Sequence, residues 1–447
     1  MKNIFLIGAG RSATVLINYL LDICEKESWF LTVGDSNLEV AKIKVGGRSA
    51  GKAILFDVND SNQLNQCVSE SDLVISMLPA GLHKFVAEAC IQYSVHFVSA
   101  SYLTEDLKSL HDSARNKDII MLNECGLDPG LDHMSAMKVL DGIRDNGGKI
   151  IGFESFTGGL LASNDGDNPW QYKFTWNPRN VVLAGLGVVK FIQQGRYKYI
   201  PYNKLFRRTE QIHIPGYGYF EGYANRDSLK YMELYNLEDI QTMYRGTLRR
   251  PGFCKAWNVF IQLGATDDTF LLENVTNMTH RQFINSFLSY NPSDSIELKL
   301  AHYLGLDMEG EEMHKLKWLD IFSDELVGLD EGTPAQILEH ILKKKWTMDE
   351  EEGDMIVMWH KFNYLLYGEE KEIHSTFVSI GENQVNTAMA KTVGLPLGIA
   401  SKLIVEGKFQ TRGVCTPIIK EIYEPIMNEL VAEFGWKFIE EEVEVSI

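Results

Sequence analysis

The sequence predicts an α/β protein in which a doubly wound parallel sheet occupies the first 125 residues and an α+β domain with a helical insertion follows. Apolar runs rich in Val, Ile, Leu and Phe recur between helical patterns, which is typical of strands covered on both faces. A glycine-rich turn closes the first of these runs. From about Gly126 the chain changes to glycine-rich and aromatic-rich stretches, which fit strands joined by longer loops.

The N-terminal domain, residues 1–125, contains short apolar runs separated by segments long enough for a crossover helix. The first such helix is predicted over Ala13–Cys24. In chain order the predicted strands are NIFLIG (3–8), WFLTVGD (29–35), ILFDV (54–58), DLVISMLP (72–79), VHFVSAS (95–101) and DIIMLNE (118–124). Strands that alternate with helices predict βαβ units and a parallel sheet.

Residues 126–386 are predicted to form a substrate-binding and dimerisation domain, with a helical insertion at about 267–345. Two strands, DMIVMWHKFNYLLY and EIHSTFVSIG, are expected after the insertion, joined by the charged turn GEEK. Residues 387–447 are predicted to be a helical segment that packs back on the first domain.

The charge balance excludes some classes of partner. Among 447 residues, 43 are basic and 61 acidic, and the formal net charge is −18. Nucleic acids and anionic membranes need a basic footprint, so neither is expected as a partner. A local basic pocket for an acidic metabolite remains compatible with this composition.

The N-terminus and the cysteines indicate the compartment. The run before the first glycine has about six apolar residues, which is too short for a signal peptide core or a membrane span, so a cytoplasmic location is expected. The cysteines show no C-x-x-C spacing, which predicts neither a disulfide framework nor a zinc site. They are Cys24, Cys67, Cys90, Cys125, Cys254 and Cys415.

The turn after the first strand carries a G-x-G-x-x-A fingerprint at Gly8, Gly10 and Ala13. The first glycine permits the turn, the second lets the backbone approach a pyrophosphate, and the alanine lets the helix sit close to the strand. Asp35 ends the second strand, where a carboxylate accepts from a ribose 2′-hydroxyl and repels a 2′-phosphate, so NAD is favoured over NADP. Arg48, several residues later, could weaken this preference, so NADP remains the alternative cofactor.

Two polar motifs follow the fifth and sixth strands and so lie at the carboxyl edge of the sheet, where open α/β sheets bind ligands. They are SASY (99–102) and NECGLDPGLDHM (123–134). The second motif is compatible with a metal cage, a tight turn or a loop that holds a substrate. Without a fourth ligand in view, the metal hypothesis is disfavoured. Asp132 is expected to be a helix N-cap, which leaves Asp128 aimed into the cleft.

Arginines cluster in the second domain. Arg226 lies in GYANRDS, and YRGTLRR contains Arg245, Arg249 and Arg250. Because the arginine fork holds a carboxylate through two parallel hydrogen bonds, several arginines in an acidic chain favour a substrate with more than one carboxylate. For any one arginine, a surface ion pair is the alternative.

Taken together, GAGRSATVL, ISMLPAGLH, VSASYLT, GLDPGLDHM, EGYANRDS, YRGTLRRPGF and GLPLGIASKLI give the chain its resemblance to a known family. It resembles the glutamate-forming saccharopine dehydrogenases, and most of all the dehydrogenase half of the bifunctional aminoadipic semialdehyde synthase. The resemblance implies a homodimer that oxidises saccharopine, with water, to L-glutamate and 2-aminoadipate 6-semialdehyde.

The resemblance also implies site residues. Those that contact saccharopine are Ser101, Tyr102, Asp128, Arg226, Thr247, Leu248 and Arg249, with Asp128 and Tyr102 as the catalytic pair. Those that contact the dinucleotide are Gly8, Ala9, Gly10, Arg11, Ser12, Ala13, Gly34, Asp35, Ser36, Asp57, Val58, Ala100, Ser101, Leu127, Asp128, Pro129 and Thr175. No metal is implied. The general base stays unassigned, with His133 and Glu124 as candidates.

Two departures from the family pattern stand out. The loop Gly158–Asn164 reads GGLLASN where the family commonly has GGLPAPE, and Thr175 stands where serine is usual. The biosynthetic fungal members carry an arginine near the position of Asp35, whereas the catabolic members resemble this chain. That difference favours NAD and the lysine-degrading direction.

Two other functions compete. A related secondary-amine dehydrogenase, such as carboxynorspermidine dehydrogenase, acts on a substrate with fewer carboxylates, so the arginine cluster counts against it. A non-catalytic dinucleotide sensor would keep the fold, but the intact SASY, GLDPG, NRDS and RGTLR motifs count against that function.

Overall fold

The protein is described by a computed structural model, in which residues 1–162 and 167–444 are described. Its contacts divide the chain into two compact units. The first unit comprises Met1–Lys149, Leu366–Glu369 and Phe377–Ile439, and the second comprises Ile150–Leu365, Glu370–Thr376 and Glu440–Ile447. The predicted boundary at residue 125 is a boundary of sequence texture and stays a prediction. The contact division falls after the helix that follows it.

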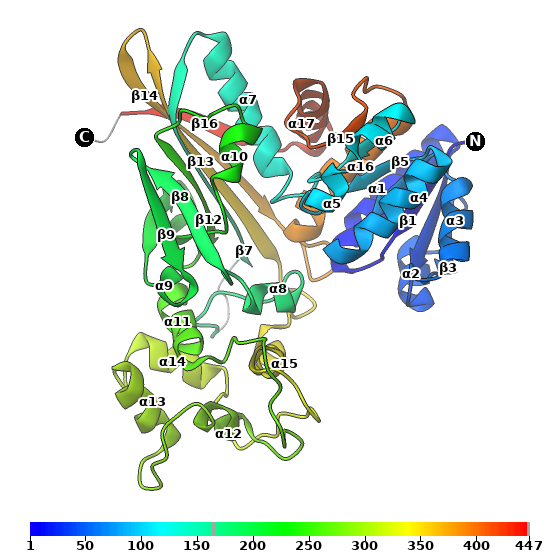
Figure 1. Cartoon of the computed structure of the whole chain (residues 1–447). Coiled ribbons are helices and arrows are strands. Elements are labelled where there is room, and N and C mark those ends of the chain that lie inside the picture. The colour runs from blue at the N-terminus through cyan, green and yellow to red at the C-terminus, as the bar shows by residue number, and fades with distance from the viewer. Residues whose placement is uncertain (163–166, 445–447) are drawn as a thin grey trace. The chain divides into compact units, whose positions relative to one another are not determined.

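The first unit is built on a parallel sheet, which confirms the predicted fold class (Figure 1). Its strands are β1 (Asn3–Ile7), β2 (Phe30–Asp35), β3 (Gly51–Leu55), β4 (Leu73–Ser76), β5 (His96–Ser99), β6 (Ile120–Leu122) and β15 (Gly413–Cys415). In the described ranges the order across this sheet is β15-β6-β5-β4-β1-β2-β3. The first strand therefore lies in the middle of the sheet, with crossovers to both sides.

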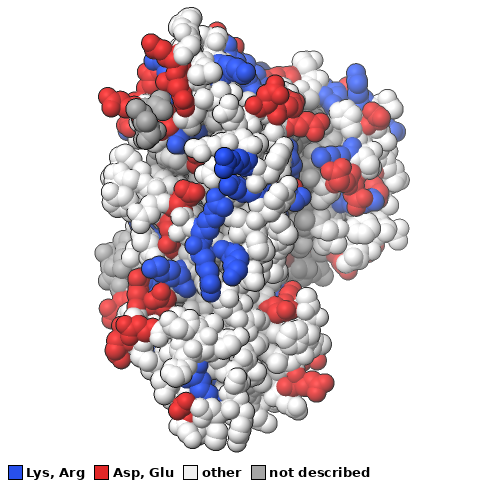
Figure 2. All heavy atoms as spheres, turned by 60° about the vertical axis from the view of Figure 1, so that its left-hand side comes forward, with Lys and Arg blue, Asp and Glu red and all other residues white. Residues whose placement is uncertain are grey.

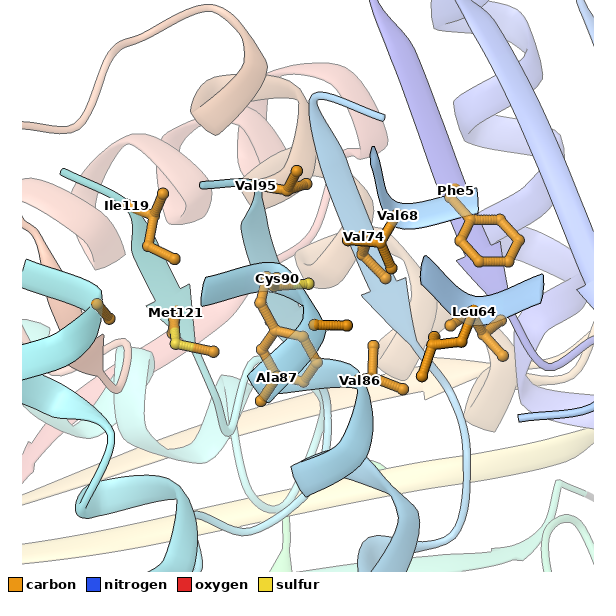
Figure 3. Packing of buried hydrophobic residues seen from close by; sticks show 14 of the residues in the cluster. Phe5, Leu64, Val68, Val74, Val86, Ala87, Cys90, Val95, Ile119 and Met121 are labelled. Carbon is orange, nitrogen blue, oxygen red and sulfur yellow. The ribbon is translucent and has the colours of Figure 1, made fainter. Parts of the chain in front are cut away.

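The helices of this unit cover the two faces of the sheet. They are α1 (Thr14–Glu27), α2 (Leu38–Val45), α3 (Ser61–Ser69), α4 (His83–Tyr93), α5 (Glu105–Lys108), α6 (His111–Asn116), α7 (Leu131–Asp145), α16 (Ala388–Val405) and α17 (Lys420–Phe434), with short 3₁₀ turns η1 (Arg11–Ala13) and η2 (Ala80–Leu82). On one face, side chains of α3 and α4 such as Leu64 and Val86 meet Phe5 and Met121 of the strands in one buried cluster (Figure 3).

The C-terminal part of the chain completes the first unit. Strand β15 pairs in parallel with β6, which the sequence pattern does not predict. Helix α16 is long and apolar enough to cross a membrane, but 83% of its apolar window is buried inside the protein. Its glycines explain that burial, because a Cβ at Gly394 would lie 2.8 Å from the backbone nitrogen of Leu16 and one at Gly398 would lie 2.5 Å from the Tyr19 ring. Helix α16 is therefore a core helix packed on α1.

The second unit is organised around a mixed sheet. Its strands are β7 (Lys149–Leu161), β8 (Val188–Gln193), β9 (Arg196–Pro201), β10 (Thr209–Ile214), β11 (Gly218–Ala224), β12 (Thr242–Arg249), β13 (Asp354–Leu366), β14 (Glu369–Ile380) and β16 (Phe438–Val443). In the described part of the chain the main path runs β10-β11-β12-β7-β13-β14-β16, and β8 pairs with β12 and β9.

The predicted helical stretch between the strands is present. The helices of the second unit are α8 (Pro178–Val182), α9 (Tyr202–Leu205), α10 (Lys230–Leu234), α11 (Phe253–Leu263), α12 (His280–Asn285), α13 (Ile296–Leu304), α14 (Glu311–Trp318) and α15 (Pro334–Trp346). Trp170, Phe253, Trp257 and Trp346 pack ring against ring in its core, with Trp170 and Trp346 centroids 5.3 Å apart. Aromatic pairs of this kind stabilise a core beyond the area they bury.

The predicted position of the turn between the two long strands, GEEK (368–371), is wrong. Strand β13 runs to Leu366 and β14 begins at Glu369, so the turn is Tyr367–Gly368. Both residues have positive φ, 53° and 88°, which is the geometry of a two-residue type I′ hairpin. Because the turn has only two residues, Glu369, Glu370 and Lys371 belong to strand β14.

Charge is distributed unevenly over the surface. Figure 2 brings forward the side of Figure 1 that carries β8, β9 and α9, and Lys and Arg gather in the middle of that face. Exposed cations of these elements include Arg196 and Lys204. A chain with a net charge of −18 therefore still offers local positive potential.

Candidate functional site

The fingerprint turn has the geometry a dinucleotide needs. Gly8 has φ +99°, and a Cβ there would lie 3.1 Å from the carbonyl oxygen of Met77, so glycine is required. A Cβ at Gly10 would meet nothing within 4 Å, which leaves room beside the backbone for a pyrophosphate. Ala13 is buried and precedes α1, whose N-terminus favours an anion. Arg11 and Ser12 lie with Ala13 in the 3₁₀ turn η1, which connects Gly10 to helix α1.

Asp35 holds this turn to the end of β2. Its Oδ2 accepts a hydrogen bond from the backbone N–H of Ala9 at 2.6 Å, and its Oδ1 accepts from that of Asn37 at 2.8 Å. Gly34 precedes it, and a Cβ at Gly34 would lie 2.9 Å from Cβ of Phe56. Ser36 is exposed at the same edge. The carboxylate is therefore fixed at the strand end where an adenosine ribose is expected.

Lys44 joins this group, although the sequence analysis did not select it. From α2 its Nζ donates to the carbonyl oxygen of Gly10, and burial lowers its pKa to about 8 while Asp35 acts in the opposite sense. The eight residues between Asp35 and Lys44 carry no motif that brings the two side chains together, so only the fold shows their proximity. Arg48, by contrast, is engaged by Asp22 and Glu25 of α1.

Other cofactor candidates lie along the same edge. Asp57 and Val58 follow β3, and the exposed Asp57 carboxylate accepts from the backbone N–H of Asn59 at 2.9 Å. Ala100 follows β5, and Leu127 and Pro129 lie in the loop after β6. Their positions at the carboxyl ends of parallel strands fit the predicted contacts, which stay predictions.

The proposed catalytic pair lies in this unit and is in contact. Tyr102 Oη donates to Asp128 Oδ1 at 3.1 Å, although the two residues come from loops after different strands. Both side chains are half-buried. A carboxylate that is partly accessible and held by a phenol can accept from a substrate N–H with its remaining lone pairs.

The loop that contains Asp128 is folded tightly on itself. Gly126 N–H donates to Pro129 O at 3.0 Å, and Leu131 N–H donates back to Gly126 O at 2.8 Å. The predicted N-cap role of Asp132 is wrong: α7 begins at Leu131, and Asp132 lies in its first turn, where Oδ1 accepts from Gly130 N–H at 2.7 Å. The helix starts two residues earlier than an N-cap at Asp132 requires, because Gly130, with φ +147°, makes the bend and is itself the N-cap.

Glu124 and His133, the two candidates for a general base, form a buried pair. His133 Nε2 and Glu124 Oε2 lie 2.8 Å apart, and Glu124 Oε1 accepts from Leu103 N–H at 2.8 Å. The exposed fraction of the side chain is 0% for His133 and 6% for Glu124. Groups so enclosed hold the loops after β5 and β6 together, and this arrangement favours a structural role. No group of three or more His, Cys, Asp or Glu suited to a metal occurs in ranges 1–162 and 167–444.

Ser101 is held by a histidine that the sequence analysis missed. His83 Nε2 lies 2.7 Å from Ser101 Oγ, and His83 Nδ1 lies 2.8 Å from Ser76 Oγ. His83 is fully buried, and burial lowers its pKa to about 4. The motif ISMLPAGLH contains both Ser76 and His83, but nothing in its spacing shows that the ring reaches Ser101.

Acid is expected to destabilise the protein through His83. The folded-state pKa of His83 lies below the ordinary histidine pKa of 6.5, so between pH 6.5 and 4 the unfolded chain binds a proton that the folded chain does not. Stability is therefore lost as the pH falls through this window, by up to about 3 kcal/mol. Melting curves of wild type and His83→Gln at pH 7 and pH 5 test this. The variant should lose less stability than wild type on acidification, and equal losses would contradict the assignment.

The arginine and strand candidates belong to the second unit. Thr247, Leu248 and Arg249 lie in β12, where Thr247 pairs with Tyr223 of β11 and with Thr157 of β7. Arg226 follows β11, has φ +50° and is exposed. Leu248 is fully buried and alternates in direction with its neighbours, so its side chain serves the core. The hydroxyl of Thr157, a residue not selected from the sequence, is buried and has no hydrogen-bond partner in the described ranges.

Arg249 is the most enclosed of the candidate residues in this unit. Its side chain is buried, with its guanidinium carbon 5.0 Å from the centroid of the Tyr172 ring and 5.2 Å from that of Phe253. Glu221 is opposite it in the strand pairing, but Glu221 Oε1 accepts from Cys254 N–H at 2.5 Å. Among the residues that the structure describes, no carboxylate forms an ion pair with Arg249.

Arg245 and Arg250 have different surroundings. Arg245 lies with its guanidinium carbon 4.0 Å from the Tyr231 ring centroid. Arg250 lies 4.4 Å from that of Phe220, and its Nη1 donates to Tyr217 O at 2.9 Å. Aromatic faces and a carbonyl therefore hold these two side chains in place.

Thr175 and the loop that departs from the family pattern also lie in the second unit. Thr175 is buried, and its Oγ1 has no hydrogen-bond partner within the described ranges, which leaves its hydroxyl able to bind a ligand. Gly158 packs on β12, because a Cβ there would lie 2.5 Å from Leu248 O. Ser163 and Asn164, at the end of the atypical loop, lie outside the described residues.

Comparison with known proteins covers nearly all of the chain. Residues 4–122 match the family model described as saccharopine dehydrogenase NADP binding domain, and residues 126–436 match the saccharopine dehydrogenase C-terminal domain. The first match shows that the chain carries a nicotinamide dinucleotide-binding domain.

Some of the similar proteins have about the length of this chain, and others are more than twice as long. The chain is 32% identical to saccharopine dehydrogenase [NADP(+), L-glutamate-forming] of Schizosaccharomyces pombe, over 97% of each. It is 36% identical to the mitochondrial alpha-aminoadipic semialdehyde synthase of Rattus norvegicus over 85% of this chain, and it spans less than half of that relative, 42%. The apo saccharopine dehydrogenase (L-Glu forming) structure from Saccharomyces cerevisiae matches with a TM-score of 0.89, 29% identity, and coverage of 99% and 100%.

Proposed function

Because the chain belongs to the saccharopine dehydrogenase family, we propose that it oxidises saccharopine with a nicotinamide dinucleotide and water, giving L-glutamate and 2-aminoadipate 6-semialdehyde. The fungal relatives of equal length carry this activity in their names. The motifs SASY, GLDPG, NRDS and RGTLR, on which the resemblance to the family rests, are all present in this chain.

The observation that carries the proposal is the buried guanidinium of Arg249. A buried charge is costly unless it is paired, and no carboxylate pairs with this one among the described residues. Arg249 Nη1 donates to the carbonyl oxygen of Leu248 at 2.9 Å, and the four N–H donors that remain fit a carboxylate, which saccharopine supplies more than once. Arg226, exposed in its loop, is proposed to hold a second carboxylate.

The chemistry sets the roles of the remaining residues. Saccharopine is a secondary amine, and loss of hydride from the carbon on its lysine side gives an imine that water hydrolyses. When bound, the oxidised nicotinamide supplies the hydride acceptor. Asp128, already oriented by Tyr102, is proposed to accept from the substrate nitrogen and to hold it while its proton leaves. Arg249 and Arg226 limit the movement of the substrate, which favours a reactive geometry.

Replacing Asp128 by asparagine should lower kcat/KM for saccharopine about 10- to 100-fold, because a charged acceptor becomes a neutral one. Asp106→Asn is the control: its carboxylate lies on α5 of the same unit and is 68% exposed in a 3.6 Å ion pair with Lys84. Steady-state rates measure both. If Asp128→Asn leaves turnover and affinity equal to the control, the role of Asp128 is wrong.

We propose NAD as the preferred dinucleotide, since the Asp35 carboxylate is held at the end of β2, where an adenosine ribose is expected and where it would repel a 2′-phosphate. The names of fungal relatives favour NADP as the alternative, and Lys44 is the cation that could accommodate the phosphate.

A pair of variants separates the two dinucleotides. Asp35→Asn keeps an oxygen for Ala9 N–H and removes the charge, so the ratio of kcat/KM for NADP to that for NAD should rise about tenfold. Lys44→Met should lower the same ratio. A wild-type preference for NADP would overturn the assignment to NAD.

The decisive experiment for the function is a steady-state assay of the purified chain with saccharopine and with carboxynorspermidine, each with NAD and NADP. Turnover of saccharopine supports the proposal, and turnover of carboxynorspermidine alone would replace it. Tight NADH binding without turnover of either substrate would favour a dinucleotide sensor. Sedimentation of the same sample tests the proposed homodimer. The cytoplasmic location stays a prediction.

A further inference from the structure

A chain of three hydrogen-bonded side chains leads from the interior of the first unit to Ser101. Ser76 ends β4, His83 begins α4, and Ser101 follows β5. The imidazole bridges the two hydroxyls, at 2.8 Å on the Nδ1 side and 2.7 Å on the Nε2 side. Ser76 and His83 are fully buried, whereas Ser101 is half-buried. Of the three groups, Ser101 is therefore the one that a ligand can reach.

The position of the imidazole is set by packing that is independent of these hydrogen bonds. Val86 and Cys90, on the next turns of α4, are buried in the cluster shown in Figure 3. The His83 ring also meets Phe97 of β5 edge to face, with centroids 6.3 Å apart. Because the core fixes the helix and the ring, His83 is a rigid reference to which Ser101 is held.

A neutral imidazole couples the two hydroxyls. One ring nitrogen donates and the other accepts, so the two serines must take opposite roles toward the ring. When Nε2–H donates to Ser101 Oγ, Nδ1 accepts from the Ser76 hydroxyl, and the hydroxyl hydrogen of Ser101 is left to donate elsewhere. In the other tautomer, the hydrogen of Ser101 is used by the ring. The ring tautomer therefore decides whether Ser101 can donate to a ligand.

We propose that His83 is a positioning residue for the reaction: its Nε2–H holds Ser101 Oγ and leaves the Ser101 hydroxyl to donate to an oxygen of the bound substrate. In this arrangement the Ser76 hydroxyl, 2.8 Å from Nδ1, is the donor to that nitrogen. This proposal rests on the proposed function and on the contact between Ser101 and saccharopine that the family resemblance implies. It adds a residue outside the motifs SASY, GLDPG, NRDS and RGTLR.

Two amide variants distinguish the two ring nitrogens. The side-chain amide of glutamine reaches the place of Nε2, whereas that of asparagine reaches the place of Nδ1. His83→Gln should therefore keep the contact to Ser101 and retain kcat/KM for saccharopine within about threefold. His83→Asn should keep only the contact to Ser76 and lose about 10- to 100-fold, since Ser101 loses its partner. Thermal melts confirm that both variants are folded.

A double-mutant cycle tests whether His83 acts through Ser101. In the Ser101→Ala background, His83→Asn should have no further effect on kcat/KM, because the group it positions is already gone. If the loss from His83→Asn persists undiminished in that background, the positioning role is overturned and His83 only supports the fold. Equal losses for the glutamine and asparagine variants would overturn it as well.

A measurement without turnover separates this proposal from the proposed function. Long-range ¹H–¹⁵N spectra of the imidazoles should show His83 neutral and protonated at Nε2, with its resonances assigned by their loss in His83→Gln. Ser101→Ala should shift the Nε2 resonance. A His83 protonated at Nδ1 would overturn the inference even if saccharopine is turned over. Absence of saccharopine turnover in wild type would overturn the proposed function and leave the tautomer result standing.

Discussion

Replacing Arg249 by methionine is expected to lower kcat/KM for saccharopine about 30- to 1000-fold, mainly through KM. Methionine keeps the apolar contacts with Tyr172 and Phe253 but removes the buried fork. Loss of one partner of a desolvated, hydrogen-bonded charge pair costs roughly 2–5 kcal/mol, and that cost appears only when substrate is bound. The KM for the dinucleotide should change much less.

Arg250→Met is the matched control. Arg250 is the next residue in the chain, but its guanidinium lies over Phe220 and donates to a backbone carbonyl. It should leave kcat/KM within about threefold. Arg249→Lys should fall between the two, because an ammonium keeps the charge without the bidentate geometry. An unchanged saccharopine KM in folded Arg249→Met would show that this arginine is structural.

The second large effect is expected at Gly130. A Cβ at this position would lie 2.2 Å from both the nitrogen and the oxygen of Gly126, and φ is +147°, a conformation that L-residues rarely adopt. Gly130→Ala must therefore open the loop that carries Asp128. The free energy of unfolding is expected to fall by several kcal/mol, because steric strain of the backbone is among the few causes of so large a loss. Thermal unfolding and yield of folded protein measure it.

Gly142→Ala is the control for this substitution. Gly142 lies in α7, the helix that begins at Leu131, and a Cβ there would meet nothing within 4 Å. Alanine in place of glycine in an exposed helix interior stabilises by up to about 1 kcal/mol. The two glycine variants should thus move the melting temperature in opposite directions. A melting temperature for Gly130→Ala at or above that of wild type would show that the loop adapts.

The strands β1 to β6 of the first unit could be predicted because they contain short apolar runs, as in β4 and β5, whereas β15 could not. The predicted and observed strand boundaries differ where the apolar pattern is weak. The sequence predicts that the third strand begins at Ile54, but β3 begins at Gly51, which lies outside the apolar run. A Cβ at Gly51 would lie 2.5 Å from the Leu21 side chain, so that glycine is needed for close packing. Hydrophobic pattern records burial and not this steric requirement.

Part of the candidate site could not be predicted for a similar reason. Asp35 ends a predicted strand and Asp128 lies in the loop after another, so the topology alone predicts that both lie at the carboxyl edge of the sheet. Lys44 and His83 reach the same edge from helices, and their roles depend on where a side chain points in space. A single sequence carries periodicity and spacing, but not those directions.

Strand β15 has a consequence for the order in which the protein forms. Its residues Gly413–Cys415 pair with β6 from almost 300 residues further along the chain, with Gly413 N–H donating to Ile119 O at 2.8 Å. During synthesis, β6 has an unpaired edge until the chain has been made as far as Cys415 and that segment has left the ribosome, and such an edge favours pairing with other chains. An excised N-terminal fragment would keep that vulnerability permanently. The dinucleotide-binding unit is therefore better produced as part of the full chain than alone.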